Sequence, residues 1–207
     1  MKLEVPYYSQ FKNVAREEFK PNGSGRACAA ACLKMALEFI KRERAPTIDE
    51  LFDEALIIQE DMLKKGLTTA NSTARGLPHD IIVFVAHNHG VPAYKEEFKS
   101  VSVDLKEKSF SFNPDGEKMR EFGISKIIKT LKEEGLSIAS VAPNFSTNRE
   151  SHLVLLTGFE EKNGELTGFY YHNPDDRGGE SKGLFVDIGD FREKWRKMAI
   201  FFPSLKA

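Results

Sequence analysis

Cys28 and Cys32 are the only two cysteines of the chain and lie four residues apart. The segment from Cys28 to Arg42 is rich in strong helix formers and ends in basic residues, which predicts a buried helix whose first turn carries Cys28. A thiol there lies at the positive end of the helix macrodipole, which favours the thiolate. A disulfide within one helical turn is awkward, because both Cβ atoms point the same way along the axis. Cys32 is therefore expected to pack in the core, whereas Cys28 is a candidate nucleophile.

A thiolate nucleophile needs a base, usually histidine, and a group that orients the base. His152 begins an apolar segment after a polar loop, so its ring can emerge at the edge of a sheet. The next predicted strand ends just before Asn173, and a hairpin between the two strands would bring Asn173 close to His152. Asp175 is the alternative orienting residue. His152 and Asn173 follow Cys28 by 124 and 145 residues, an order and spacing that resemble those of papain-like peptidases.

The predicted elements run from helices in the first part of the chain to strands in the second. Helices are expected over 28–42, 47–65, 78–89 and 124–134, the second opened by the capping box Thr47-Ile-Asp-Glu50. Residues 101–105 and 109–112 alternate like a hairpin or a surface flap. Strands are expected over 136–142, 152–157, 166–172, 184–188 and 199–202, with a hairpin turn at Asn163-Gly164 and a brief helix from Asp190. This order predicts an α+β fold with an antiparallel sheet, in a single domain over residues 1–207.

Composition and charge narrow the classes of function. The chain has 207 residues, of which 41% are hydrophobic and 29% charged, and a formal net charge of −1. These values are typical of a soluble globular protein, and the balanced charge predicts no general attraction to nucleic acid or to an anionic membrane. The N-terminus does not resemble a signal peptide and no apolar run reaches the length of a membrane span. We therefore expect a cytoplasmic protein, with a secreted protein trimmed of its leader as the alternative.

His87 and His89 raise the alternative of a metal site. They are expected at a helix end before Gly90, where their side chains diverge, and the sequence offers no obvious third ligand. Solvated histidines near a helix C-terminus are therefore the preferred interpretation, and we expect neither a metal nor another cofactor.

Four segments with distinctive residue patterns occur in order along the chain. They are Val5-Pro-Tyr-Tyr-Ser-Gln10, Ala27-Cys-Ala-Ala-Ala-Cys-Leu-Lys-Met-Ala-Leu37, Ser151-His-Leu-Val-Leu-Leu-Thr-Gly-Phe159 and His172-Asn-Pro174. Together they resemble the papain-fold peptidases that process bacteriocin leaders at a double glycine, and the stand-alone relatives of those peptidases. The resemblance implies a nucleophilic helix packed on an antiparallel sheet, with Cys28 as nucleophile, His152 as general base, Asn173 as its orienting residue and Gln10 as a donor to the oxyanion. Residues from about 42 to 120 would form a helical and flap region that varies within the family.

Three positions depart from the family pattern. Ala29 stands where the family usually has Gly, Asn173 replaces the more frequent Asp, and Leu153 replaces an aromatic residue. The resemblance predicts a cysteine hydrolase that cleaves a peptide or related amide bond through an acyl-enzyme, with a peptide or small amide as its partner. A peptide-binding module without turnover is the alternative, and acyl transfer to an amine would use the same residues. The intact Cys28, His152 and Asn173 favour the enzyme.

Overall fold

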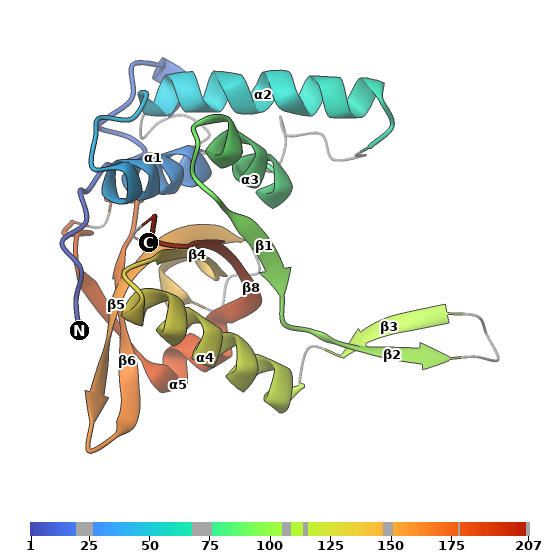
Figure 1. Cartoon of the computed structure of the whole chain (residues 1–207), viewed down its shortest axis with the longest axis vertical. Coiled ribbons are helices and arrows are strands. Elements are labelled where there is room, and N and C mark those ends of the chain that lie inside the picture. The colour runs from blue at the N-terminus through green and yellow to red at the C-terminus, as the bar shows by residue number, and fades with distance from the viewer. Residues whose placement is uncertain are drawn as a thin grey trace.

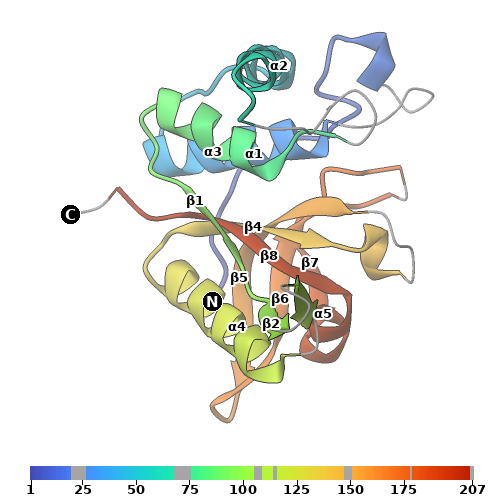
Figure 2. The same ribbon diagram turned by 90° about the vertical axis from the view of Figure 1, so that its right-hand side faces the viewer.

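Three helices, α1 (Cys28–Lys41), α2 (Ile48–Lys64) and α3 (His79–Asn88), gather on one side of a six-stranded sheet in the computed structural model (Figure 1, Figure 2). The structure describes residues 1–19, 27–67, 76–104, 109–113, 116–146, 151–177 and 179–205. Nearly every residue of α1 is buried, because this helix lies between α2 and α3 on one side and β5 of the sheet on the other. The position of α1 thus fixes Cys28, its first residue, against the sheet.

The sheet is antiparallel throughout, and its strand order differs from the order in sequence. From one edge to the other it runs β1 (Tyr94–Glu97), β8 (Trp195–Phe202), β4 (Leu136–Val141), β5 (His152–Lys162), β6 (Glu165–His172) and β7 (Leu184–Asp187). Helix α4 (Glu117–Lys132) packs on β4, β5 and β8, and the short α5 (Ile188–Lys194) packs on β6 and β7, below the sheet as drawn in Figure 2. There are also two 3-10 turns, η1 (Glu17–Phe19) and η2 (Pro143–Phe145).

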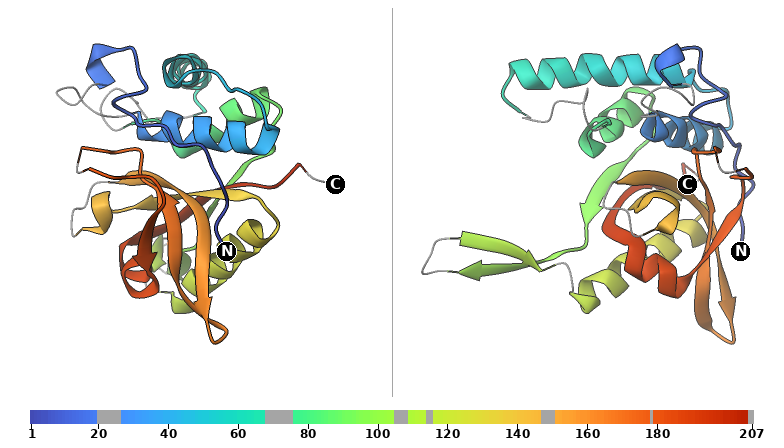
Figure 3. Two further views of the ribbon diagram at one scale, coloured as in Figure 1. Left: turned by 90° about the vertical axis from the view of Figure 1, so that its left-hand side faces the viewer. Right: turned by 180° about the vertical axis from the view of Figure 1, so that it is seen from behind.

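The remaining strands form a hairpin of their own. Strands β2 (Ser100–Asp104) and β3 (Ser109–Asn113) pair antiparallel, and they project away from the helices and the main sheet (Figure 1, Figure 3). This pairing confirms the hairpin predicted from the alternating sequence.

The N-terminal segment connects the two layers. The backbone N–H of Leu3 donates to the carbonyl of Thr157 at 2.8 Å, and that of Phe159 donates to the carbonyl of Met1 at 2.9 Å. The close approach depends on Gly158, since a Cβ at this position would lie 2.4 Å from the Met1 carbonyl oxygen. From there the segment rises from the sheet to the helices (Figure 3), which places residues 7–12 where the two layers meet.

The α+β order predicted from the sequence is confirmed, including the capping box at Thr47 and Glu50. One prediction was wrong in detail, and one strand was not predicted. Helix α4 begins at Glu117 rather than near residue 124, and it runs through Gly123, where a Cβ would lie 2.6 Å from the rings of Phe98 and Trp195. Tertiary packing therefore selects a residue that is a poor helix former. Strand β1 was not predicted, because its Tyr-Lys-Glu-Glu sequence is that of a short, charged edge strand.

Candidate active site

Cys28 is the first residue of α1 and is only partly exposed, whereas the helix behind it is buried. The N-cap residue is Ala27, which has no side-chain hydrogen bond to cap the helix. The backbone N–H groups of Ala29 and Leu153 donate to the Cys28 sulfur instead. The sulfur thus accepts one backbone N–H from the first turn of α1 and one from β5, and the first of these agrees with the helix-dipole argument made from the sequence.

His152 is the first residue of β5 and is 8% exposed. Its ring shares a hydrogen bond with the Cys28 thiol. Burial alone would raise the pKa of Cys28, but this hydrogen bond and the charge of His152 outweigh it, so the pKa lies below that of an ordinary thiol. Burial would likewise lower the pKa of His152, but the contacts with Cys28 and Asn173 outweigh it and raise the pKa. Both shifts favour a thiolate beside an imidazolium.

Asn173 follows β6 directly, and its Oδ1 lies 2.7 Å from Nε2 of His152. The backbone N–H of Asp175 donates to the same atom at 3.0 Å. Since a backbone N–H can only donate, this atom must be the amide oxygen, and Nε2 of His152 must carry the hydrogen that points at it. The other ring nitrogen, Nδ1, is then the one that can exchange a proton with Cys28.

Asp175 does not make this contact, although the sequence left it open as the orienting residue. Its carboxylate accepts two hydrogen bonds from the Arg177 side chain, at 3.0 Å from Nε and 2.6 Å from Nη2, and one from the Arg177 backbone N–H at 3.2 Å. Burial would raise the pKa of Asp175, but these bonds outweigh it and keep the carboxylate charged. Its negative charge adds a smaller contribution to the raised pKa of His152. The structure therefore brings Asn173 onto His152 and directs Asp175 to Arg177.

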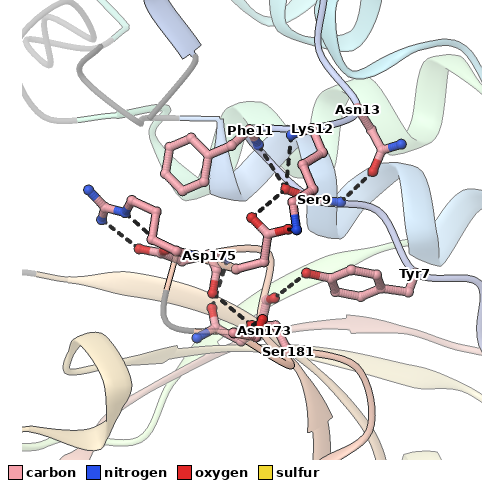
Figure 4. Close-up of polar contacts among 11 residues, drawn as sticks. Tyr7, Ser9, Phe11, Lys12, Asn13, Asn173, Asp175 and Ser181 are labelled. Carbon is pink, nitrogen blue, oxygen red and sulfur yellow. Dashed lines mark hydrogen bonds and ion pairs between the residues drawn. The ribbon is translucent and has the colours of Figure 1, made fainter. Parts of the chain in front are cut away.

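Gln10 lies beside Pro174, because its backbone N–H donates to the Pro174 carbonyl at 2.9 Å, and its side chain is almost fully buried. The preceding residue anchors this segment: Ser9 Oγ donates to Asp176 at 2.8 Å and accepts from the N–H groups of the two residues that follow Gln10, each at 3.0 Å. Figure 4 shows the hydrogen bonds of Ser9 with Phe11 and Lys12. Gln10 is thus held beside the loop that carries Asn173.

Tyr7 strengthens this connection between the N-terminal segment and the loop after β6. Its hydroxyl donates to the carbonyl of Asn173 at 3.1 Å (Figure 4). Burial, helped by the charge of Asp176, raises the pKa of Tyr7 to about 12, so the hydroxyl stays a donor at physiological pH. Sequence reasoning missed Tyr7 and also Asn144, whose Oδ1 accepts from Nδ2 of Asn173 at 3.1 Å. Neither residue carries a sequence signal beyond its place in a turn or an extended segment.

The other candidate residues lie apart from this cluster. Cys32 is fully buried, its thiol lies 3.5 Å from the Leu153 carbonyl oxygen, and burial raises its pKa well above that of an ordinary thiol. His87 and His89 contact different partners: Nε2 of His87 is 2.8 Å from the carbonyl oxygen of Ala93, and Nε2 of His89 is 2.8 Å from the carboxylate of Glu54. Both lie at the end of α3 as expected, where His87 is exposed and His89 half-buried, and each also makes a hydrogen bond within the protein. Among the described residues, no three metal-ligating side chains come together.

Comparison with known proteins agrees with this geometry. Helix α1 begins at Cys28 and packs against an antiparallel sheet, one strand of which, β5, begins at His152. This is the arrangement of the papain-like cysteine peptidases. Residues 2–200 match the profile of the Peptidase_C39 like family, and the chain belongs to that family. The family match confirms the resemblance seen in the sequence. No curated protein matches the chain significantly in sequence.

Three solved structures are similar in fold. One is a double glycine motif protease from an AMS/PCAT transporter in complex with the leader peptide, at 15% identity over 98% of this chain and 94% of that one, with a TM-score of 0.51. A second, a protein from Bacillus anthracis classed as a C39-like peptidase, is 14% identical over 98% and 97% of the two chains, with a TM-score of 0.61. The third is the peptidase domain of Streptococcus ComA, a bi-functional ABC transporter involved in quorum sensing, at 15% identity over 89% and 96% and a TM-score of 0.53. In the described part of the present chain, no helix is long and apolar enough to cross a membrane.

Proposed function

We propose that this protein cleaves a peptide or related amide bond with Cys28 as nucleophile, His152 as acid and base, Asn173 as orienting residue and Gln10 as oxyanion donor. The observation that carries the proposal is the continuous hydrogen-bonded chain from Cys28 through His152 to Asn173. The pKa of Cys28 is lowered and that of His152 is raised, so the two side chains form the reactive pair of thiolate and imidazolium. A buried pair with no chemical role would gain nothing from holding a thiolate.

The reaction follows from these positions. The Cys28 thiolate attacks the carbonyl carbon, a C–S bond forms, and the electron pair of the C=O bond moves to the oxygen. The Cys28 backbone N–H and the side-chain amide of Gln10 donate to that oxyanion. As the tetrahedral intermediate collapses, the C–N bond breaks and Nδ1 of the His152 imidazolium gives its proton to the leaving amine. A water molecule then gives a proton to the same nitrogen and attacks the thioester, which releases the acid and restores Cys28.

A peptide is the substrate class that the comparisons favour, since one similar structure holds a leader peptide. The alternative, a peptide-binding module without turnover, would need no activated thiol. Acyl transfer to an amine would use the first half of the reaction and then an amine in place of water. Analysis of the products distinguishes hydrolysis from acyl transfer, because only hydrolysis releases a new carboxylic acid.

The test is turnover of a peptide library by the wild type, Cys28→Ala and His152→Ala, combined with labelling by a peptidyl vinyl sulfone. We expect cleavage and a single thioether at Cys28 in the wild type, neither in Cys28→Ala, and slow labelling in His152→Ala. Cys32→Ala is the matched control, because it removes the other thiol and should leave cleavage and labelling intact. Peptide binding without any cleavage or labelling of the wild type would refute the enzyme and support the binding module.

A further inference from the structure

His172, the last residue of β6, is a buried histidine that the proposed reaction does not use. It directly precedes Asn173, and it is only 2% exposed. Both of its ring nitrogens make contacts far along the chain: the backbone N–H of Gly183 donates to Nδ1 at 2.9 Å, and Nε2 lies 3.1 Å from the carbonyl oxygen of Val5. The ring thus links β6 to two other segments.

These partners define the protonation state of the ring. A backbone N–H can only donate, so Nδ1 of His172 must be an acceptor without a hydrogen. A carbonyl oxygen can only accept, so Nε2 must carry the hydrogen that it donates to Val5. A ring with one hydrogen is neutral. Protonation of Nδ1 would place a second N–H opposite the N–H of Gly183 and break that contact.

The charges that act on the ring favour this neutral state. Burial lowers the pKa of His172 and outweighs the contact with the Val5 carbonyl, which raises it. The positive charges of Lys182 and Lys2 lower the pKa further. Lys182 directly precedes Gly183, and Lys2 donates to the Gly183 carbonyl at 3.4 Å. Both cations therefore oppose a charged ring.

The other groups around the ring are neutral or paired. The Tyr7 ring meets the His172 ring edge to face with the centroids 5.6 Å apart, and burial raises the pKa of Tyr7, so its hydroxyl stays neutral. On β5 the residue opposite His172 is the apolar Leu155. The acidic side chains of the loop after β6 are held in ion pairs, Asp175 with Arg177 and Asp176 with Lys12. These surroundings offer little to stabilise a protonated ring.

The two contacts of the ring join the segments that carry Gln10 and Asn173. Val5 lies in the N-terminal segment, which continues to Gln10, and Gly183 ends the loop that begins at Asn173. The backbone N–H of Asn173 donates to the carbonyl of Ser181 at 2.9 Å, so this loop is closed at two successive residues. The ring therefore closes the loop on one side and fixes the N-terminal segment on the other.

We propose that His172 is a positioning residue of the active site, whose neutral ring holds the segment of Gln10 and the loop of Asn173 in one arrangement. The inference rests on the proposed function, because Gln10 and Asn173 have catalytic roles only under that function. His172 acts through these two residues: it sets where the oxyanion donor lies relative to the residue that orients His152. A displacement of about 1 Å between such groups can cost roughly 100-fold in rate.

The structural part is tested without catalysis, by NMR of Cys28→Ala at neutral pH. The nitrogen chemical shifts of the His172 ring should be those of the neutral tautomer with its hydrogen on Nε2. Adding His172→Ala should speed hydrogen exchange at the backbone N–H groups of Gln10 and Asn173 by roughly 10- to 100-fold, because two buried hydrogen bonds are lost. His87→Ala removes another ring that bonds to the backbone, at Ala93 after α3, and should change neither exchange rate.

Two conservative variants separate the contacts of the ring. In His172→Asn the new Oδ1 can accept from Gly183 in place of Nδ1, so exchange at Asn173 should stay slow while exchange at Gln10 becomes faster. In His172→Gln the new amide can donate to Val5 in place of Nε2, so the pattern should be reversed. Each variant keeps one of the two contacts, so they still decide the question if His172→Ala fails to fold.

The catalytic part uses the same substitutions in the wild type. His172→Ala should lower kcat by roughly 10- to 100-fold, with little change in the peptide affinity measured on Cys28→Ala, and His172→Asn and His172→Gln should each restore part of the rate. In the Gln10→Ala background His172→Ala should cost less, because part of its effect is exerted through Gln10. His87→Ala should leave kcat unchanged.

The outcomes separate the two proposals. The expected exchange pattern in a protein that cleaves nothing would refute the peptidase and confirm that His172 holds the two segments. Full kcat in His172→Ala would confirm the peptidase and overturn the positioning role. A charged ring or the opposite tautomer, unchanged exchange in the His172 variants, or an equal loss of kcat with and without Gln10 would also overturn that role.

Discussion

Asn144 holds the side-chain amide of Asn173: its Oδ1 accepts from Nδ2 of Asn173 at 3.1 Å. Asn144 has φ of 51° and ψ of 30°, a left-handed conformation that asparagine tolerates better than most residues. The next residue, Phe145, packs its ring against Tyr171 of β6 with the ring centroids 5.2 Å apart. A turn after β4 thus fixes the rotation of the Asn173 side chain, which contacts His152.

Asn144→Gly should reduce kcat with little change in KM, because it keeps the backbone conformation and removes the acceptor. The loss of one hydrogen bond worth roughly 0.5–1.5 kcal/mol predicts a decrease of about 2- to 10-fold. Asn144→Asp keeps an acceptor oxygen and should restore most of the rate. Asn163→Gly is the control, since Asn163 has a similar φ of 53° in the distant β5–β6 turn. Equal effects at the two positions would argue that Asn144 only shapes its turn.

The ion pair of Cys28 and His152 predicts a bell-shaped dependence of activity on pH. The pKa of Cys28 is lowered, so the thiolate is present from a pH below that of an ordinary thiol. The pKa of His152 is raised, so the ring keeps its proton above the pH at which a free imidazole loses it. Activity should rise as Cys28 loses its proton and fall as His152 loses its proton. Between these two pKa values the thiolate and the imidazolium are present together.

Alkylation by iodoacetamide, measured at a series of pH values in the Cys32→Ala background, tests the acid limb. In His152→Ala the hydrogen bond and the charge of His152 are lost, so burial, which raises the pKa of Cys28, is opposed only by the backbone donors of Ala29 and Leu153. The inflection should therefore move to higher pH in this variant. An inflection that stays in place would show that His152 does not activate the thiol.

Asn173 and Asp175 make different contacts, which predicts unequal effects of removing them. Asn173→Ala should lower kcat by at least roughly tenfold, because Nε2 of His152 loses the acceptor that sets its tautomer. Asn173→Asp keeps this acceptor and should be tolerated. Asp175→Asn should change kcat/KM by less than Asn173→Ala, since its main partner is Arg177, and it should move the basic limb of the pH profile to lower pH. Greater damage from Asp175→Asn would make Asp175 the orienting residue.

The sequence predicted the parts of the site that depend on local structure. The residue types of α1 predict a helix, and the apolar runs of β5 and β6, joined at Asn163-Gly164, predict a hairpin. The contact of His152 with Asn173 is a consequence of this one hairpin. Asn144 could not be found this way, because its role depends on contact between two turns far apart in the chain. The pairing of β4 with β8, which includes a register shift, likewise joins sequences more than fifty residues apart. Such long-range register leaves no periodic pattern in the sequence.

Replacement of Gln10 is expected to weaken stabilisation of the transition state and to leave binding of the substrate almost unchanged. Its buried side chain follows a backbone that is anchored to Pro174 on one side and to Asp176 through Ser9 on the other. One oxyanion donor is typically worth about 2.7–4 kcal/mol of the barrier, so with Gln10 in the proposed role Gln10→Ala should slow acyl-enzyme formation by roughly 100- to 1,000-fold. Gln10→Glu should be equally slow at neutral pH, because it replaces the donor with an acceptor.

Two measurements check this prediction. The single-turnover rate of thioester formation is compared between the wild type and the variants, and peptide affinity is compared between Cys28→Ala and the double variant Cys28→Ala/Gln10→Ala. The affinity should hardly change, because the negative charge on the oxygen develops only during the reaction. Gln59→Ala removes another buried glutamine, on the outer helix α2, and controls for the general cost of losing such a side chain. A loss of affinity in Gln10→Ala as large as the loss of rate would assign Gln10 to substrate binding rather than to the oxyanion.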